Sequence, residues 1–224
     1  MSSHYETLPN TLYPDAFHVA APEAPLGREV WPRQPGVFIR LVGSEAEAPA
    51  HPDPSQRALV AGQFGLVPRW VKSASDAKLR STKLVNARAD TMSTSTNFRE
   101  AWLAGQRCIV PMMAFLADDW RSGKAVPTRI ARVDGKPMGV AGLWECWKGL
   151  EGEVIVSYAL LTVNANSHAL MHRYQQPGSD KSMPVILNEG AWDAWLSAPV
   201  EKAREFLRAY PATALLANPV EKKR

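Results

Sequence analysis

Residues 154–163 have the sequence VIVSYALLTV, a ten-residue run dominated by valine, isoleucine and leucine. Side chains of this kind favour a buried β-strand, and this is the clearest strand signal in the chain. Shorter signals of the same type predict strands at 37–42, 57–67, 107–110, 128–132 and 138–143. Asp134-Gly135 stands between the last two, and this dipeptide is a typical hairpin turn. The sequence therefore predicts a protein built mainly of antiparallel strands.

Helical signals are few and short. Eighteen prolines are spread along the chain and argue against long helices, and residues 9–54 predict loops and short strands. Amphipathic spacing predicts short helices at 97–104, 191–196 and 200–209. Repeats and linkers are absent from the sequence. We expect an α+β fold, a single compact domain over residues 1–210 with a barrel-like core, followed by a C-terminal tail over 211–224.

Composition narrows the class of protein. The 224 residues are 46% hydrophobic and 21% charged, values of soluble globular chains rather than disordered, collagen-like or coiled-coil ones. Apolar runs are too short for a membrane helix, and the first residues have no signal-peptide pattern, so we expect a cytoplasmic protein. Cys108 and Cys146 are too few for a disulfide framework or a zinc cage. We expect neither a metal nor a cofactor.

The charge balance favours an acidic partner without establishing one. Lysine and arginine exceed aspartate and glutamate by 26 − 22 = 4, and the isoelectric point is about 9.1. This excess helps a polyanion to approach. Eight tryptophans are suited to a core, and equally to stacking on unpaired bases.

Six segments, taken in chain order, carry a family resemblance. They are GLVPRW (65–70), NARADT (86–91), RCIVP (107–111), AGLWE (141–145), the segment 162–172 and MPVIL (183–187). This order and spacing resembles the SOS-response-associated peptidase family, whose members sense abasic sites in single-stranded DNA. The resemblance covers residues 2 to about 196, and SHYE at 3–6 is similar to a bacterial and phage-associated branch. It implies a β-rich α+β fold with a positively charged cleft, and single-stranded DNA with abasic sites as the partner. We expect a monomer without membrane contacts.

The family's chemistry starts at its N-terminal residue. There, removal of the initiator methionine exposes a cysteine whose α-amine attacks the aldehyde of an abasic sugar, and whose thiol then closes a thiazolidine. Position 2 here is Ser2. A free α-amine has a pKa of about 7.7–8.0, so Ser2 can still form an imine once Met1 is removed. A hydroxyl is a poorer nucleophile than a thiol for closing the ring. We expect reversible, lyase-like chemistry without a durable crosslink; the alternative is an inert Ser2.

The resemblance also implies roles for other residues. The NAR segment places an assisting asparagine at Asn86 and a phosphate-binding arginine at Arg88, whose guanidinium suits a phosphate. The spacing from threonine to histidine places an assisting histidine at His172. Residues expected to contact DNA around this centre are Phe64, Pro68, Arg69, Trp70 and Lys72.

Two further departures from the family pattern keep other functions open. The family's glutamate position is Ala117 here, with Asp118 and Asp119 beside it as candidate substitutes, and the extra residues 173–182 interrupt an H-x-R-M-P run. The first hypothesis is an abasic-site enzyme with hydrolase, peptidase or lyase character. The second is a catalytically silent single-stranded DNA-binding module. The third is a phage accessory protein that does not act on DNA.

Overall fold

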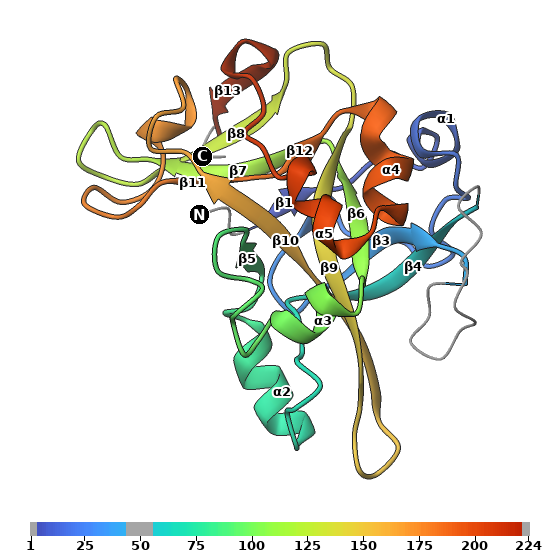
Figure 1. The fold of residues 1–224 in the computed structure, drawn as a ribbon. Helices are drawn as coiled ribbons and strands as arrows, with labels where there is room; N and C mark the ends of the chain where they lie inside the picture. The colour runs from blue at the N-terminus through green and yellow to red at the C-terminus, as the bar shows by residue number, and fades with distance from the viewer. Residues whose placement is uncertain (1–3, 44–55, 221–224) are drawn as a thin grey trace.

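Strand β10 (Val154–Asn164) lies at the centre of the fold, as its apolar run predicts. The computed structural model describes residues 4–43 and 56–220. In it, β10 pairs antiparallel with β9 (Met138–Lys148) and parallel with β4 (Arg57–Phe64). β3 (Pro35–Leu41) and β6 (Arg107–Met112) join β4 to β9, so five strands close into a barrel in the order β10–β4–β3–β6–β9 (Figure 1). Closure pairs every barrel strand on both sides.

The other strands extend this barrel at one end. β5 (Asn86–Arg88) and β11 (Ser182–Pro184) pair with β10, and β12 (Ile186–Leu187) pairs with β9. A second sheet contains, in spatial order, β13 (Leu215–Pro219), β8 (Val126–Arg132), β7 (Ala114–Asp119), β1 (Tyr5–Glu6) and β2 (Glu29–Val30). The expected α+β domain with a barrel-like core is confirmed.

The helices are short, as the prolines predict. They are α1 (Leu12–Phe17), α2 (Ala74–Ser81), α3 (Arg99–Leu103), α4 (Trp192–Ser197) and α5 (Val200–Ala203), with single 3₁₀ turns at Met171–Arg173, Glu189–Ala191, Arg204–Phe206 and Ala212–Ala214. α4 covers β6, where the Trp195 indole donates to the Cys108 carbonyl at 2.9 Å. Within the described ranges, no helix has the length and apolarity to span a membrane.

The barrel interior is aromatic. Tyr5 and Tyr158 share a hydrogen bond between their hydroxyls, and Phe64 packs on both rings. The chain passes so close to this cluster at Gly36 that a Cβ there would lie 1.9 Å from the Tyr158 hydroxyl. Phe64 is fully buried, so the expectation that it contacts DNA is wrong: its ring fills the core.

Three predictions about the chain's course are also corrected. Asp134-Gly135 does form a turn, but no hairpin follows, because β8 pairs with β7 and β13 while β9 pairs with β6, β10 and β12. Residues 12–17 are helical where loops and strands were expected. The boundary at residue 210 falls too early, because β13 pairs with β8 and belongs to the domain. Residues 221–224 lie outside the described residues.

Candidate functional site

A cavity of about 450 Å³ opens between β5, β10, β7 and the segment 175–182. Its wall is charged with both signs. The charged residues are Arg88, Asp90, Asp118, Asp180 and Lys181. The buried hydroxyl of Thr162, on β10, also lines this cavity. Such a wall offers a phosphate-binding group and several proton-transfer groups in one space.

Strand β5 positions Arg88. Parallel pairing with β10 sets Asn86 beside Leu160 and Arg88 beside Thr162. Alternation along a strand places Asn86 and Arg88 on one face, opposite the buried Ala87. Arg88 lines the cavity, whereas the Asn86 side chain does not reach its wall. The predicted asparagine and arginine therefore share a strand face, but only the arginine borders the cavity.

The Arg88 guanidinium is paired with a carboxylate of the same chain, that of Asp90. Its Nη2 donates to Asp90 Oδ2 at 2.7 Å and its Nε to Asp90 Oδ1 at 3.1 Å. These hydrogen bonds lower the pKa of the Asp90 carboxyl and raise the pKa of the Arg88 guanidinium. Both side chains are about half exposed. A phosphate that binds Arg88 must therefore replace a weakly held internal carboxylate.

The two candidate aspartates on strand β7 differ in their exposure and in their ion pairs. Ala117 is buried in the core, and its neighbour Asp118 is exposed and lines the cavity. Asp119 binds Arg121 at 2.6 Å, and the hydrogen bonds from Arg121 lower the pKa of its carboxyl. Asp118 is therefore the aspartate available to a cavity ligand.

Strand β1 pairs with the same strand β7 and places His4 beside it. Tyr5 lies opposite Phe115, and the Leu116 amide donates to the His4 carbonyl at 3.1 Å. The His4 ring stacks on Trp31 with 3.6 Å between centroids. Burial lowers the pKa of His4, opposed by the charges of Glu29 and Asp118. Ser2 lies outside the described residues.

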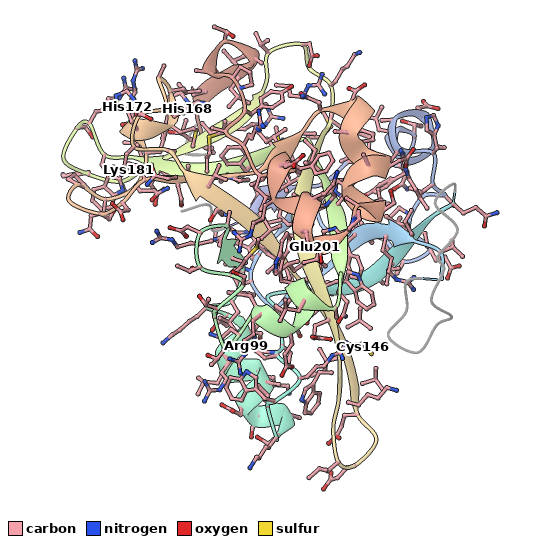
Figure 2. The ribbon with its side chains drawn as sticks, viewed as in Figure 1. Arg99, Cys146, His168, His172, Lys181 and Glu201 are labelled. Atoms are coloured by element: carbon pink, nitrogen blue, oxygen red, sulfur yellow. The ribbon has the colours of Figure 1, made fainter. Side chains whose placement is uncertain are left out.

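His172 lies outside the cavity. It is exposed and lines a separate groove, and its Nδ1 is 2.7 Å from the His168 carbonyl. His168 itself is bound on both ring nitrogens: Nε2 lies 2.6 Å from the Tyr210 carbonyl, and Nδ1 accepts from the Met171 amide at 2.9 Å. His168 therefore has a structural role. In Figure 2 both histidines lie near Lys181 at one end of the molecule.

Asp180 and Lys181 also line the cavity, although neither was expected as a site residue. Counting three residues back from Met183 places Asp180 where the H-x-R-M-P run has its histidine, and this register was the available signal. The Lys181 ammonium donates to the carbonyls of Gln175 and Gln176 at 2.9 and 2.8 Å. These bonds hold the segment 175–181 against the cavity as an ordered wall.

The residues expected to contact DNA lie elsewhere on the barrel. Pro68 is buried. Arg69 donates from Nε to the buried Glu145 carboxylate at 2.6 Å and also binds Gln106, so it acts as an internal counter-ion. Lys72 is exposed. None of the three borders either the cavity or the His172 groove.

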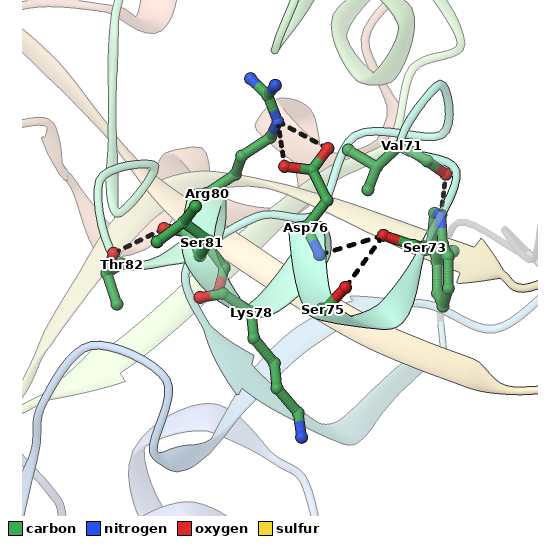
Figure 3. A network of polar contacts seen from close by, with 10 residues as sticks. Val71, Ser73, Ser75, Asp76, Lys78, Arg80, Ser81 and Thr82 are labelled. Carbon is green, nitrogen blue, oxygen red and sulfur yellow. Dashed lines mark hydrogen bonds and ion pairs between the residues drawn. The ribbon is translucent and has the colours of Figure 1, made fainter.

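Trp70 stands beside α2. Trp70 is 39% exposed, its indole donates to the Thr96 carbonyl at 3.0 Å, and the Arg80 guanidinium lies 4.7 Å from the ring centroid. Figure 3 shows how α2 is held: Ser73 Oγ accepts from the Asp76 amide at 3.2 Å, and Asp76 binds Arg80 at 2.9 Å. Trp70 is therefore a fixed aromatic surface, separate from the cavity.

Comparison with known proteins identifies the family. Residues 7–223 match the family described as SOS response associated peptidase (SRAP). The chain is 27% identical over 191 residues to abasic site processing protein HMCES of Gallus gallus, and the aligned region covers 75% of this chain and 54% of that protein. It is 32% identical over 148 residues to abasic site processing protein YoqW of Bacillus subtilis (strain 168), covering 65% and 60%.

The match extends to three dimensions. The chain spans only 54–60% of the length of those two relatives. A crystal structure of a protein from Bordetella bronchiseptica, however, superposes along nearly the whole chain. Its TM-score is 0.87 at 39% identity, with 98% of this chain and 100% of that chain covered. The chain belongs to the SOS response associated peptidase (SRAP) family.

Proposed function

We propose that this chain binds abasic sites in single-stranded DNA, and that the α-amine of Ser2, exposed by removal of Met1, forms an imine with the sugar aldehyde. One observation carries the proposal: β1 holds His4 against β7, the strand whose Asp118 lines the cavity beside Arg88. A peptide chain advances at most about 3.6 Å per residue, so the α-carbons of Ser2 and His4 are at most about 7 Å apart. The amine is therefore within chain reach of the segment that borders the cavity.

The proposed covalent step follows ordinary imine chemistry. The lone pair of the uncharged amine attacks C1′ of the open-chain aldehyde and gives a carbinolamine, which loses its hydroxyl as water to form the imine. We assign proton transfer in this step to Asp118, which lines the cavity, and give no part in it to Asn86, which does not. Arg88 exchanges Asp90 for a backbone phosphate. Loss of a C2′ proton from the imine would expel the 3′ phosphate, which is the lyase outcome.

A silent DNA-binding module is the second candidate function. A buried alanine, Ala117, occupies the family's glutamate position, and Ser2 has no thiol with which to close a stable ring. Both changes remove groups used for durable crosslinking, while Arg88 is kept. This candidate predicts DNA affinity without any covalent product.

The deciding experiment is the intact mass of the purified protein after mixing with an abasic oligonucleotide, with and without borohydride. We expect Met1 to be absent and an adduct to appear only with borohydride, which reduces the imine to a stable amine. The variant Ser2→Cys should form an adduct without borohydride, because its thiol can close the ring. Peptide mapping must locate the adduct at residue 2. No trapped adduct, with Met1 removed and DNA bound, would establish the silent module.

A further inference from the structure

The wall formed by residues 175–181 has a second side. The cavity lies on one side of it, and a groove of about 370 Å³ lies on the other. Trp120, Gln175 and Lys181 line both spaces. We name the second space the outer groove. Its remaining wall includes Arg121, His172, Arg173, Pro177 and Gly178. A polymer that occupies the cavity can continue into the outer groove past these three shared residues.

The outer groove is cationic. Arg121, Arg173 and Lys181 each contribute a positive charge, and no carboxylate is among its lining residues. Asp119 neutralises Arg121 from outside the groove at 2.6 Å. Within the described part of the chain, no carboxylate lies within ion-pair distance of Arg173. Arg173 is therefore the cation most available to an anionic ligand.

The groove also contains an aromatic surface and an unused ring nitrogen. Trp120 is partly exposed, and an indole face is a platform on which an unpaired base can stack. His172 donates its Nδ1 proton to the His168 carbonyl, so Nε2 is the ring atom that remains for a ligand. The Arg173 cation, the Trp120 indole face and the His172 Nε2 atom together fit a nucleotide with its phosphate.

The groove is built before a ligand arrives. Gln175 has a left-handed φ of 78°, a conformation that is uncommon outside glycine and asparagine. Its side-chain amide donates to the Ser182 carbonyl at 2.6 Å, and its backbone amide donates to the Asp118 carbonyl at 3.0 Å. With the two bonds from Lys181, these contacts fix the shared wall. A fixed wall lowers the ordering cost of binding.

From these observations we infer that the outer groove binds the nucleotide next to the abasic nucleotide in a single DNA strand. Its phosphodiester pairs with Arg173 and its base stacks on Trp120, while the abasic sugar occupies the cavity. This inference rests on the proposed function. It gives His172 a role in holding the flanking nucleotide, rather than in acid–base chemistry at the sugar.

The test compares oligonucleotides that carry a stable tetrahydrofuran abasic analogue at the 5′ end, at the 3′ end or in the middle. Fluorescence anisotropy gives the dissociation constant of each for wild type, Trp120→Ala, Arg173→Gln and the control Arg99→Gln. Arg99 is exposed on α3 and lies far from His172 and Lys181 in Figure 2. Circular dichroism confirms that each variant is folded.

We expect both groove variants to weaken binding about fivefold or more when the flank that enters the groove is present, and less than twofold when it is missing. Arg173→Gln should also reduce the slope of log affinity against log salt by about 0.7, the value for one phosphate contact in single-stranded DNA. Arg99→Gln should match wild type.

Separate outcomes identify which idea fails. Equal losses on all three oligonucleotides, or no loss, would overturn the groove assignment and leave the proposed function standing. Normal flank dependence with no borohydride-trapped adduct would overturn the imine chemistry and keep the groove. Absence of any DNA binding by the wild-type chain would overturn both.

Discussion

The buried carboxylate of Glu145 predicts a large loss of stability when its counter-ion is removed. It is 1% exposed and accepts hydrogen bonds from Arg69 Nε at 2.6 Å, Gln106 Nε2 at 3.2 Å and the Cys146 amide at 3.1 Å. Arg69 supplies the only cation among these donors. The variant Arg69→Met keeps most of the aliphatic stem and removes the charge, so it leaves a buried carboxylate without its counter-ion.

The expected loss of stability follows from this geometry. Removing one partner of a buried ion pair costs about 3–5 kcal/mol. The Arg69 side chain is 41% exposed, so water already screens part of the interaction, and we take the lower end, about 3 kcal/mol. In a domain of this size, 1 kcal/mol corresponds to a change in Tm of about 2–4 °C. Arg69→Met should therefore lower Tm by about 6–12 °C.

Urea denaturation at pH 7 measures the free energy of unfolding directly. The double variant Arg69→Met/Glu145→Gln should recover most of the loss, because the buried charge is gone. An Arg69→Met variant within 1 kcal/mol of wild type, or a double variant no more stable than the single one, would refute the reasoning. So would a large loss of DNA affinity at unchanged stability, because Arg69 would then be a DNA contact rather than an internal counter-ion.

Three further predictions concern other parts of the chain. Asp90→Asn should tighten binding of abasic single-stranded DNA about 1.4- to 5-fold in anisotropy titrations, because the exposed pair that a phosphate must break is worth about 0.2–1 kcal/mol; unchanged or weaker binding would contradict this. Gly36→Ala should cost about 1–3 kcal/mol by urea denaturation, because its Cβ would lie 1.9 Å from the Tyr158 hydroxyl. Gly190→Ala, with open space around its Cβ, should cost less than about 0.5 kcal/mol. Burial raises the pKa of Tyr13 to about 12 and raises the pKa of Tyr5 and Tyr158 as well. Above pH 10 the folded state therefore binds more protons than the unfolded state. The free energy of unfolding that these tyrosines contribute is fully present below pH 10 and should fall as the pH rises toward 12. A urea midpoint that stays constant over that range would exclude the mechanism.

Strand positions were predictable because strand formation depends on local composition. β3, β4, β6, β8, β9 and β10 all begin within about three residues of a predicted start. The start of α2 also has a local signal in the sequence: Ser73 precedes Asp76 by three residues, the spacing at which an N-cap hydroxyl binds a helix amide. The structure forms that bond.

Strand partners were not predictable from local signals. Asp134-Gly135 has the right residues for a turn, and the turn forms, with Asp134 bound to Arg132 at 2.6 Å. The strands on either side nevertheless enter different sheets, because β9 finds partners in β6, β10 and β12 that are distant in sequence. Turn chemistry determines a local change of direction, whereas pairing is selected by burial over the whole domain.

In the candidate site, too, local sequence signals do not determine which individual residues border the cavity. Of the positions taken from the family pattern, Arg88 borders the cavity, whereas Ala117 and His172 do not. Asp118 and Asp180, one and eight residues from them, line it instead. Neighbouring residues on a strand point to opposite faces, so a one-residue offset exchanges a buried alanine for an exposed carboxylate. An inserted segment has no fixed register, so only Met183, whose strand β11 pairs with β10, sets the position of Asp180. The pattern therefore leads to the region of the candidate site, but strand pairing determines which side chains border its cavity.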